Sequence, residues 1–262
     1  MSDLAHLLPF FNGLLLCRMV YLRQDGPLGS RRNAVLLLVQ GAGIWLLYGL
    51  STATIALSLV VLGAAGLNLL FEQRWFDLAR GWRSLTLFFT LLGATLVATL
   101  LGNLSLAPGV ESAATFFAAH VPLFPTSLTA AAFGLLLFGL LMLANETNIV
   151  IRAVFHYLRL EPTPSEPLEA RDPKLVSISA DDYRAGRAIG ILERWLVYLV
   201  VVSGSDLTAI GFILAAKGLV RFKRLERDNA DRFAEYLLIG TLLSTLCALL
   251  IGTWVRELLL AL

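Results

Sequence analysis

The stretch "AVLLLVQGAGIWLLYGLSTATIALSLVVLGAAGLNLLF", residues 34–71, contains no charged residue. As a single helix it would be about 57 Å long, nearly twice the roughly 30 Å hydrocarbon core of a bilayer. Two spans that turn near Gly49-Leu50-Ser51 fit the run better, over about 34–50 and 52–71. The stretch therefore predicts two transmembrane helices, and with them an all-α, polytopic membrane protein.

The composition of the whole chain agrees with this fold class. Of the 262 residues, 57% are hydrophobic and 15% are charged, whereas an average soluble domain is about 25% charged. The formal net charge of +2 is too small to suggest a nucleic-acid partner. Cys17 and Cys247 lie far apart in apolar surroundings, so we expect neither a structural disulfide nor a metal site.

Other apolar runs predict five more spans, at about 84–105, 126–145, 187–203, 207–221 and 235–254. The total is then about seven spans. Residues 4–21 are also apolar, but they contain Pro9, Asn12 and Arg18. We interpret this segment as an N-terminal interfacial or half-inserted helix, with an eighth span as the alternative.

The basic residues predict the orientation of the spans. Eighteen of the 21 Lys and Arg residues fall in four regions, Arg18 to Arg32, Arg74 to Arg83, Arg152 to Arg187 and Arg221 to Arg232. With the spans above, all four regions lie on one side of the membrane. The connections at 106–125 and 203–206, on the other side, contain no Lys or Arg. Because basic loops stay in the cytoplasm, this pattern places the four regions there and the C-terminus outside.

A stretch rich in Pro, Glu and Asp, residues 161–185, divides the chain. It is too polar to bury and too rich in Pro to stay helical, so we interpret it as a solvated cytoplasmic linker. Residues 1–160 then form an N-terminal membrane half with about four spans. Residues 186–262 form a C-terminal module of three spans.

Ionisable residues interrupt the three C-terminal spans, and the helical rise places them in one layer of the cytoplasmic half of the membrane. They are Glu193, Arg194, Lys217, Arg221 and Glu235. Charges inside a bilayer normally pair or line a wet cavity. We therefore predict that Glu193 pairs with Lys217, and that Glu235 pairs with Arg221 or Arg194. Small residues at helical spacing predict close packing of the same spans: Gly186 and Gly190, Gly211, Ala215 and Gly218, and Gly240, Ser244 and Ala248.

The layer has two interpretations. Its ion pairs either only fix the register of three helices, or they line a polar pocket open to the cytoplasm. The surplus of cations, two Arg and one Lys against two Glu, suits an anionic ligand, because guanidinium groups match phosphate and carboxylate geometry.

We therefore favour a carrier or lipid-handling protein for an anionic solute or headgroup. The alternatives are a non-catalytic subunit or regulator that docks a protein partner at the cytoplasmic face, and, ranked last, an intramembrane enzyme on a lipid-linked substrate. The sequence offers no nucleophile or metal-ligand set for the enzyme, and we predict no catalytic residue and no cofactor.

The segment "NIVIRAVFHYLRL", residues 148–160, forms a second cationic feature. Arg152, His156 and Arg159 recur at i, i+4 and i+7 on an otherwise apolar helix. That spacing is typical of an amphipathic helix that rests on anionic lipid headgroups. The alternative is that the stripe forms one wall of an anion or headgroup site.

The three C-terminal spans resemble a known signature. "GRAIGILERWLVYLV", "AIGFILAAKGLVRFKRLE" and "FAEYLLIGTLLS" are similar to the C-terminal signature of a bacterial family of multi-pass membrane proteins, described only as a domain of unknown function. The resemblance covers about residues 185–246 and implies a bacterial cytoplasmic (inner) membrane protein. It supplies no activity. It gives weight, as signature positions, to Glu193, Arg194, Lys217, Arg221, Phe222, Glu235, Gly240 and Thr241.

Overall fold

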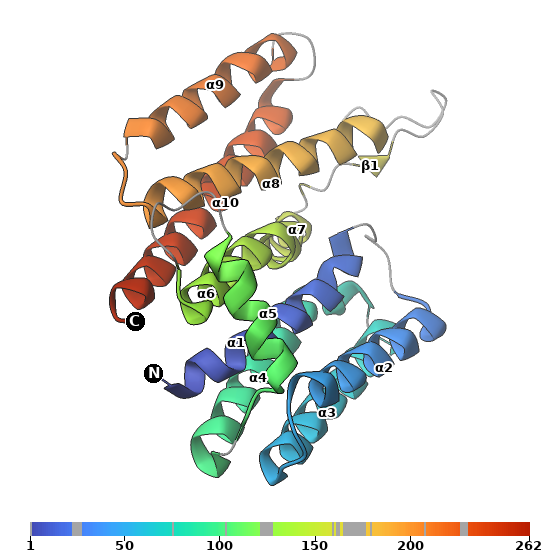
Figure 1. The fold of residues 1–262 in the computed structure, drawn as a ribbon. Helices are drawn as coiled ribbons and strands as arrows, with labels where there is room; N and C mark the ends of the chain where they lie inside the picture. Colours follow the sequence, from blue (N-terminus) through green and yellow to red (C-terminus); the bar gives the residue numbers. More distant parts are fainter. Residues whose placement is uncertain are drawn as a thin grey trace. The chain divides into compact units, whose positions relative to one another are not determined.

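The fold is taken from a computed structural model. It describes residues 2–22, 28–74, 76–102, 104–120, 128–158, 160, 163–164, 177–178, 180–206, 208–225 and 230–262. Helices make up most of this part of the chain, so the predicted all-α class is confirmed (Figure 1). The described residues also form one short parallel pair of strands, β1 (Thr163–Pro164) and β2 (Ser177–Ile178).

The chain divides into two compact units, and each is described by itself. Unit 1 comprises Met1–Ile149 with Leu258–Leu262, and unit 2 comprises Val150–Glu257. The predicted linker at 161–185 lies mostly outside the described residues. The linker and the domain boundaries drawn from it stay predictions.

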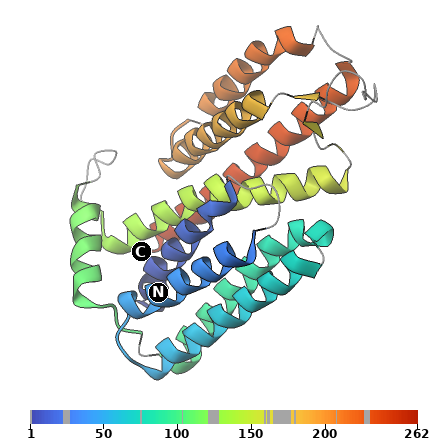
Figure 2. The ribbon, with the colours of Figure 1, turned by 90° about the vertical axis from the view of Figure 1, so that its right-hand side faces the viewer.

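Unit 1 contains most of the helices. In chain order they are α1 (Ser2–Arg18), the 3-10 turn η1 (Met19–Leu22), α2 (Ser30–Leu47), α3 (Thr52–Arg74), α4 (Phe76–Leu101), α5 (Pro108–Ala119), α6 (Ala130–Leu141) and the π-helical turn η2 (Met142–Glu146). Helices α3 and α4 lie side by side in both views (Figure 1, Figure 2). A Cβ atom at Gly93 of α4 would lie 2.8 Å from Cγ1 of Val60 on α3. The absence of a side chain at Gly93 therefore sets how closely these helices approach.

The charge-free run turns where the sequence predicted. Helix α2 ends at Leu47 and α3 begins at Thr52. The Oγ atom of Ser51 accepts a hydrogen bond of 3.1 Å from the backbone N–H of Thr54. This bond satisfies one of the N–H groups that the first turn of α3 leaves without a helical partner.

Helix α1 is the central helix of unit 1, contacting α2, α4 and α6. Its buried side chains point to more than one side and include Leu7, Leu8, Phe10, Phe11, Leu14 and Leu15, each at most 6% exposed. The Nδ2 atom of Asn12 donates a hydrogen bond of 2.9 Å to the carbonyl oxygen of Gly134 on α6. An interfacial helix would leave one face in the headgroups. By length and composition this segment is also a candidate span, in line with the eighth-span alternative, and whether residues 4–21 cross the membrane stays a prediction.

Unit 2 contains most of α7 (Thr147–Tyr157), together with α8 (Ala180–Val202), α9 (Thr208–Leu225) and much of α10 (Ala230–Leu260). Helices α8 and α9 lie side by side (Figure 1). Their connection turns at Gly204, whose φ of +69° is unfavourable for residues with a side chain. A Cβ atom at Gly252 of α10 would lie 3.1 Å from Val201 of α8, so these two helices also pack closely.

Five helical segments of the described chain are long and apolar enough to cross a membrane: Ala5–Leu22, Thr52–Phe71, Gly81–Leu101, Ala130–Tyr157 and Glu235–Leu260. Four of them match predicted spans, and the first is the N-terminal segment. The other three predicted spans correspond to α2, α8 and α9. That these three helices cross the membrane stays a prediction, as does the total of seven.

Candidate functional site

An ion pair joins α8 to α9 in unit 2. The Nζ atom of Lys217 contacts the Oε2 atom of Glu193, and the two side chains are 10% and 17% exposed. This is the pairing that the helical depth of the two residues predicted. It gives each partly buried charge an opposite charge at hydrogen-bonding distance, as a low-dielectric setting requires.

Arg194, the neighbour of Glu193, connects α8 to α10. Its side chain is 3% exposed, and Nη1 donates a hydrogen bond of 3.1 Å to the Oγ atom of Ser244. Ser244 lies nine residues, or about 13 Å, along α10 from the exposed Glu235. Arg194 thus contacts α10 far from Glu235, and its observed partner there is a hydroxyl group.

The structure therefore brings together three of the five residues predicted for the charged layer. Glu193, Arg194 and Lys217 lie on neighbouring turns of α8 and α9, with Ser244 added from α10. Glu235 is exposed. The side chain of Arg221 lies outside the described residues, so its predicted pairing with Glu235 stays a prediction.

Only some of the small residues of unit 2 lie where two helices pack closely. A Cβ atom at Gly240 would lie 2.9 Å from Cζ of Phe155, so α10 packs closely on α7 there. By contrast, no described atom lies within 4 Å of a Cβ built at Gly186, Gly211 or Gly218. Within the described residues, the predicted close-packing stripe of α9 is therefore not in contact with a neighbouring helix.

The predicted cationic stripe lies on α7. Arg152 and His156 are half-buried, and Arg159 lies outside the described residues. The ring of Phe155, also on α7, packs on Tyr236 of α10 with 4.5 Å between centroids. The stripe's role as a lipid-headgroup surface stays a prediction.

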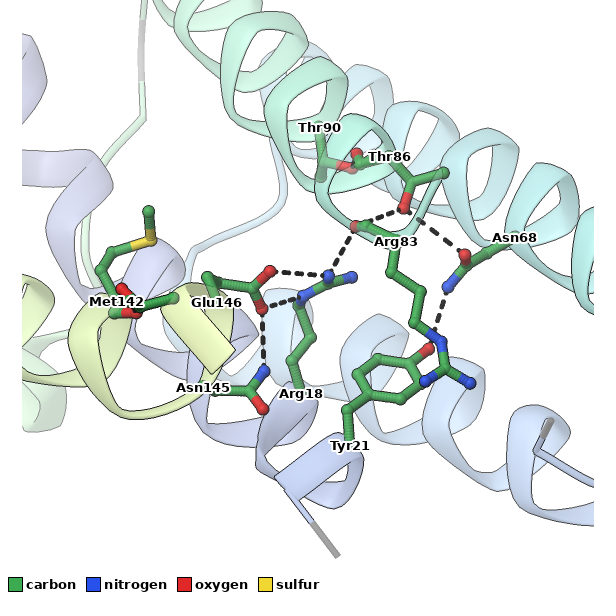
Figure 3. Close-up of polar contacts among 10 residues, drawn as sticks. Arg18, Tyr21, Asn68, Arg83, Thr86, Thr90, Met142, Asn145 and Glu146 are labelled. Carbon is green, nitrogen blue, oxygen red and sulfur yellow. Dashed lines mark hydrogen bonds and ion pairs between the residues drawn. The ribbon is translucent and has the colours of Figure 1, made fainter. Parts of the chain in front are cut away.

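A second charged cluster, which the sequence interpretation missed, lies inside unit 1 (Figure 3). Arg18 of α1 meets Glu146 of η2 through two hydrogen bonds, Nε to Oε1 at 2.7 Å and Nη2 to Oε2 at 3.0 Å. The two side chains are 5% and 4% exposed. Nη2 of Arg18 also donates to the carbonyl oxygen of Arg83 at 2.6 Å, and Nδ2 of Asn145 donates to Oε1 of Glu146 at 2.8 Å. This is the bidentate geometry in which Arg and carboxylate interact most strongly.

The π-helical turn η2 places Glu146 in this cluster. The backbone N–H of Thr147 bonds to the carbonyl oxygen of Met142, five residues back instead of the usual four. Such turns insert one extra residue into a helix and are frequent at functional sites. The polar residues of this segment are all less than 9% exposed: Asn145, Glu146, Thr147 and Asn148.

The ring of Tyr21 lies between two cations. The Cζ atoms of Arg18 and Arg83 are 5.2 Å and 4.4 Å from its centroid, within the range of a cation–π interaction. Its hydroxyl accepts a hydrogen bond of 2.9 Å from Nδ2 of Asn68. Figure 3 shows this chain of contacts continuing from Asn68 to Thr86 on α4. A single aromatic residue thus links α1, α3 and α4.

A small cavity adjoins Arg18 and Tyr21, with a volume of about 30 Å³. A water molecule needs about 10–15 Å³ by this measure, so the cavity has room for about two. The polar residues that line it are Arg18, Tyr21, Asn33, Gln40, Asn68, Thr86 and Thr90. Neither Asp nor Glu is among the described residues that line it.

Two sequence signals pointed to the cluster. Arg18 is the charged residue that ends an apolar N-terminal segment, and Glu146 directly follows the apolar run at 126–145. Opposite charges placed singly in two apolar helices are candidates for pairing. No group of three or more His, Cys, Asp or Glu that could hold a metal is found in the part of the chain that the structure describes.

No protein-family model, curated protein or solved structure matches this chain. We therefore infer its function from the geometry of the two clusters.

Proposed function

We propose that this chain is an integral membrane protein that binds an anionic solute or an anionic lipid headgroup, as a carrier or a lipid-handling protein. An excess of cations among the buried and half-buried side chains supports this proposal. Of the described side chains that are not exposed, six are Lys or Arg and two are acidic: Arg18, Arg83, Arg152, Arg187, Arg194 and Lys217 against Glu146 and Glu193.

The two acids are already used in ion pairs, Glu146 with Arg18 and Glu193 with Lys217. Of the other cations, Arg194 donates a hydrogen bond to the Ser244 hydroxyl, and Arg83 lies over the ring of Tyr21. Because charge inside a membrane is costly, an excess of one sign favours a ligand of the opposite sign. An anion is therefore the ligand class that this set of side chains suits best.

Arg194 is the residue that we propose as the main contact of this ligand. It is buried, it lies next to the Glu193–Lys217 pair, and its Nη1 atom donates a hydrogen bond to the Ser244 hydroxyl. A phosphate or carboxylate would bind the guanidinium in bidentate fashion and more strongly than a hydroxyl does. We propose further that this layer lies in the cytoplasmic leaflet of a bacterial inner membrane. The positive-inside pattern supports the leaflet, and the resemblance of residues 185–246 supports the bacterial setting.

Retention of defined lipids by the purified protein tests this proposal. We expect native mass spectrometry to show phosphatidylglycerol retained in preference to phosphatidylcholine, and Arg194→Gln to reduce the retained fraction several-fold. If the ligand is instead a free anion, inorganic phosphate should raise the melting temperature of the wild type but not of Arg194→Gln. Arg256→Gln, which removes an exposed cation from the same helix as Ser244, is the matched control. Equal retention of both lipids together with no effect of phosphate would contradict the proposal.

The pairing of both buried acids also favours a second candidate, a non-catalytic membrane subunit or regulator. In that case the ion pairs only fix the register of the helices, and a protein partner docks at the cytoplasmic face. A stoichiometric partner that co-purifies with both the wild type and Arg194→Gln would favour this candidate. Loss of lipid or phosphate binding in Arg194→Gln would favour the carrier.

A further inference from the structure

We propose that the small cavity of unit 1 is a binding site for one monovalent inorganic anion of about the size of chloride. This site is separate from the Arg194 layer, and it does not depend on the function proposed for that layer. Residues of α1, η1, α2, α3 and α4 form its wall, so it lies entirely within one compact unit.

The size of the cavity limits what can occupy it. A volume of about 30 Å³ accommodates about two water molecules. A lipid headgroup or an organic acid is many times larger than this. A single-atom ion or a water molecule is the class of occupant that fits within this volume.

The charge of the wall selects an anion over a cation. Arg18 is the charged residue among the described lining groups, and none of them is acidic. The nearest carboxylate, Glu146, accepts hydrogen bonds from Nε and Nη2 of Arg18 and from Nδ2 of Asn145. Glu146 itself is not among the described residues that line the cavity. An occupant of the cavity therefore meets the positive member of the Arg18–Glu146 pair, which attracts an anion and repels a cation.

Hydrogen-bond donors are available at the wall. Gln40 lines the cavity, and its side-chain amide makes no hydrogen bond within the part of the chain that the structure describes. A side-chain amide carries two N–H donors, so Gln40 can direct both at an occupant. Asn68 uses one of its amide protons on the Tyr21 hydroxyl and retains a second. Together with Arg18, these amides form a donor set that suits a halide.

Water is the competing occupant. Thr86 and Thr90 donate their hydroxyl protons to the carbonyl oxygens of Arg83 and Thr86, at 2.9 and 2.6 Å. Their oxygens therefore present lone pairs, which a water molecule satisfies and an anion does not. The charge of Arg18 favours the anion, because a charge-assisted hydrogen bond is roughly twice as strong as a neutral one.

The thermal stability of the purified full-length protein in detergent tests the proposal. Sodium chloride is titrated against sodium gluconate at constant ionic strength, and the melting temperature is followed by tryptophan fluorescence. We expect a saturable rise with chloride but not with gluconate, and the same rise with potassium chloride. Gluconate is too large for the cavity, and the potassium salt excludes an effect of sodium.

Substitution of Gln40 tests whether the chloride-dependent rise in melting temperature arises at this cavity. Gln40→Glu keeps the shape of the side chain and places a carboxylate in the wall, so we expect it to raise the half-saturating chloride concentration by at least tenfold. Gln40→Asn keeps the donors and should retain a weaker response. Arg194→Gln should leave the chloride response unchanged, which separates this site from the layer in unit 2.

Two outcomes would overturn the proposal. Identical melting curves in chloride and gluconate for the wild type would mean that the cavity holds water only. A chloride response that is unchanged in Gln40→Glu would mean that the ion binds elsewhere. Because the readout is the response to chloride, a variant with lower overall stability still reports on the site.

Discussion

The guanidinium of Arg18 and the carboxylate of Glu146 form two hydrogen bonds, of 2.7 and 3.0 Å, although 128 residues separate them in the chain. Both side chains are at least nine-tenths buried. The pair joins the first helix to the π-helical turn η2. It is therefore a buried polar contact between two distant segments of unit 1.

Removal of one member of this pair is expected to be more damaging than removal of both. Glu146→Gln leaves the charge of Arg18 buried without its counter-charge, which typically costs about 3–5 kcal/mol of unfolding free energy. The double variant Arg18→Met with Glu146→Leu buries no charge and should recover much of that loss. Reversible unfolding in detergent measures both. A double variant less stable than Glu146→Gln would contradict the interpretation.

The Glu193–Lys217 pair permits a charge exchange. Glu193→Lys alone and Lys217→Glu alone each place like charges against each other, so both should lower the melting temperature. The exchanged double variant restores an opposite-charge pair between α8 and α9 and should recover at least half of the lost temperature. No recovery in the double variant would mean that surrounding groups, and not the partner charge, fix each residue.

Gly93 on α4 is expected to tolerate no side chain. Gly93→Ala places a Cβ atom 2.8 Å from Cγ1 of Val60, and overpacking of this kind costs about 1–3 kcal/mol. Val60→Ala in the same chain should remove most of the effect. Gly63→Ala is the matched control, because no described atom lies within 4 Å of a Cβ there. If Gly93→Ala and Gly63→Ala have equal unfolding midpoints, the close packing of α3 on α4 does not contribute to stability.

We expect the titration of Asp206 to make the unfolding free energy depend slightly on pH. Hydrogen bonds from the side chain and from the backbone N–H of Thr208, the first residue of α9, lower the pKa of Asp206 below its ordinary value. The backbone bond, from Thr208 N to Oδ1 of Asp206, is 3.0 Å long. A carboxyl whose pKa is lowered by folding stabilises the protein above the unfolded pKa, near 4. That contribution is lost as the pH falls through the lower, folded value.

The variant Asp206→Asn keeps a capping oxygen but has no charge to titrate. We therefore expect the stability difference between wild type and Asp206→Asn to shrink as the pH is lowered from 5 to 3. Unfolding midpoints measured across this range test the expectation. A difference that stays constant with pH would contradict it.

The turn at residues 48–51 and the Glu193–Lys217 pair could be predicted from the sequence for the same physical reason. A helix has a fixed rise per residue, so the length of an apolar run locates a turn and the depth of a charge identifies its neighbours. The partner of Arg194 could not be found in this way. The charge pattern of the sequence suggests only acidic partners for Arg194, whereas in the structure Arg194 donates a hydrogen bond to the Ser244 hydroxyl.

The central position of α1 was missed because its apolar residues surround the helix, and such a helix suits lipid or a protein interior equally well. The partner of Arg18 was missed for a different reason. Glu146 faces Arg18 only because η2 adds a residue to its helix, and the apolar pattern does not show where a π-helical turn will form.

That extra residue restricts how the gene can change. A transmembrane helix defined only by its hydrophobic length tolerates the loss of one residue, since the bilayer adapts to a mismatch of 1.5 Å. Deletion of one residue within 142–145 would restore a regular helix and turn Glu146 about 100° away from Arg18. Single-residue insertions and deletions would therefore be selected against in this segment.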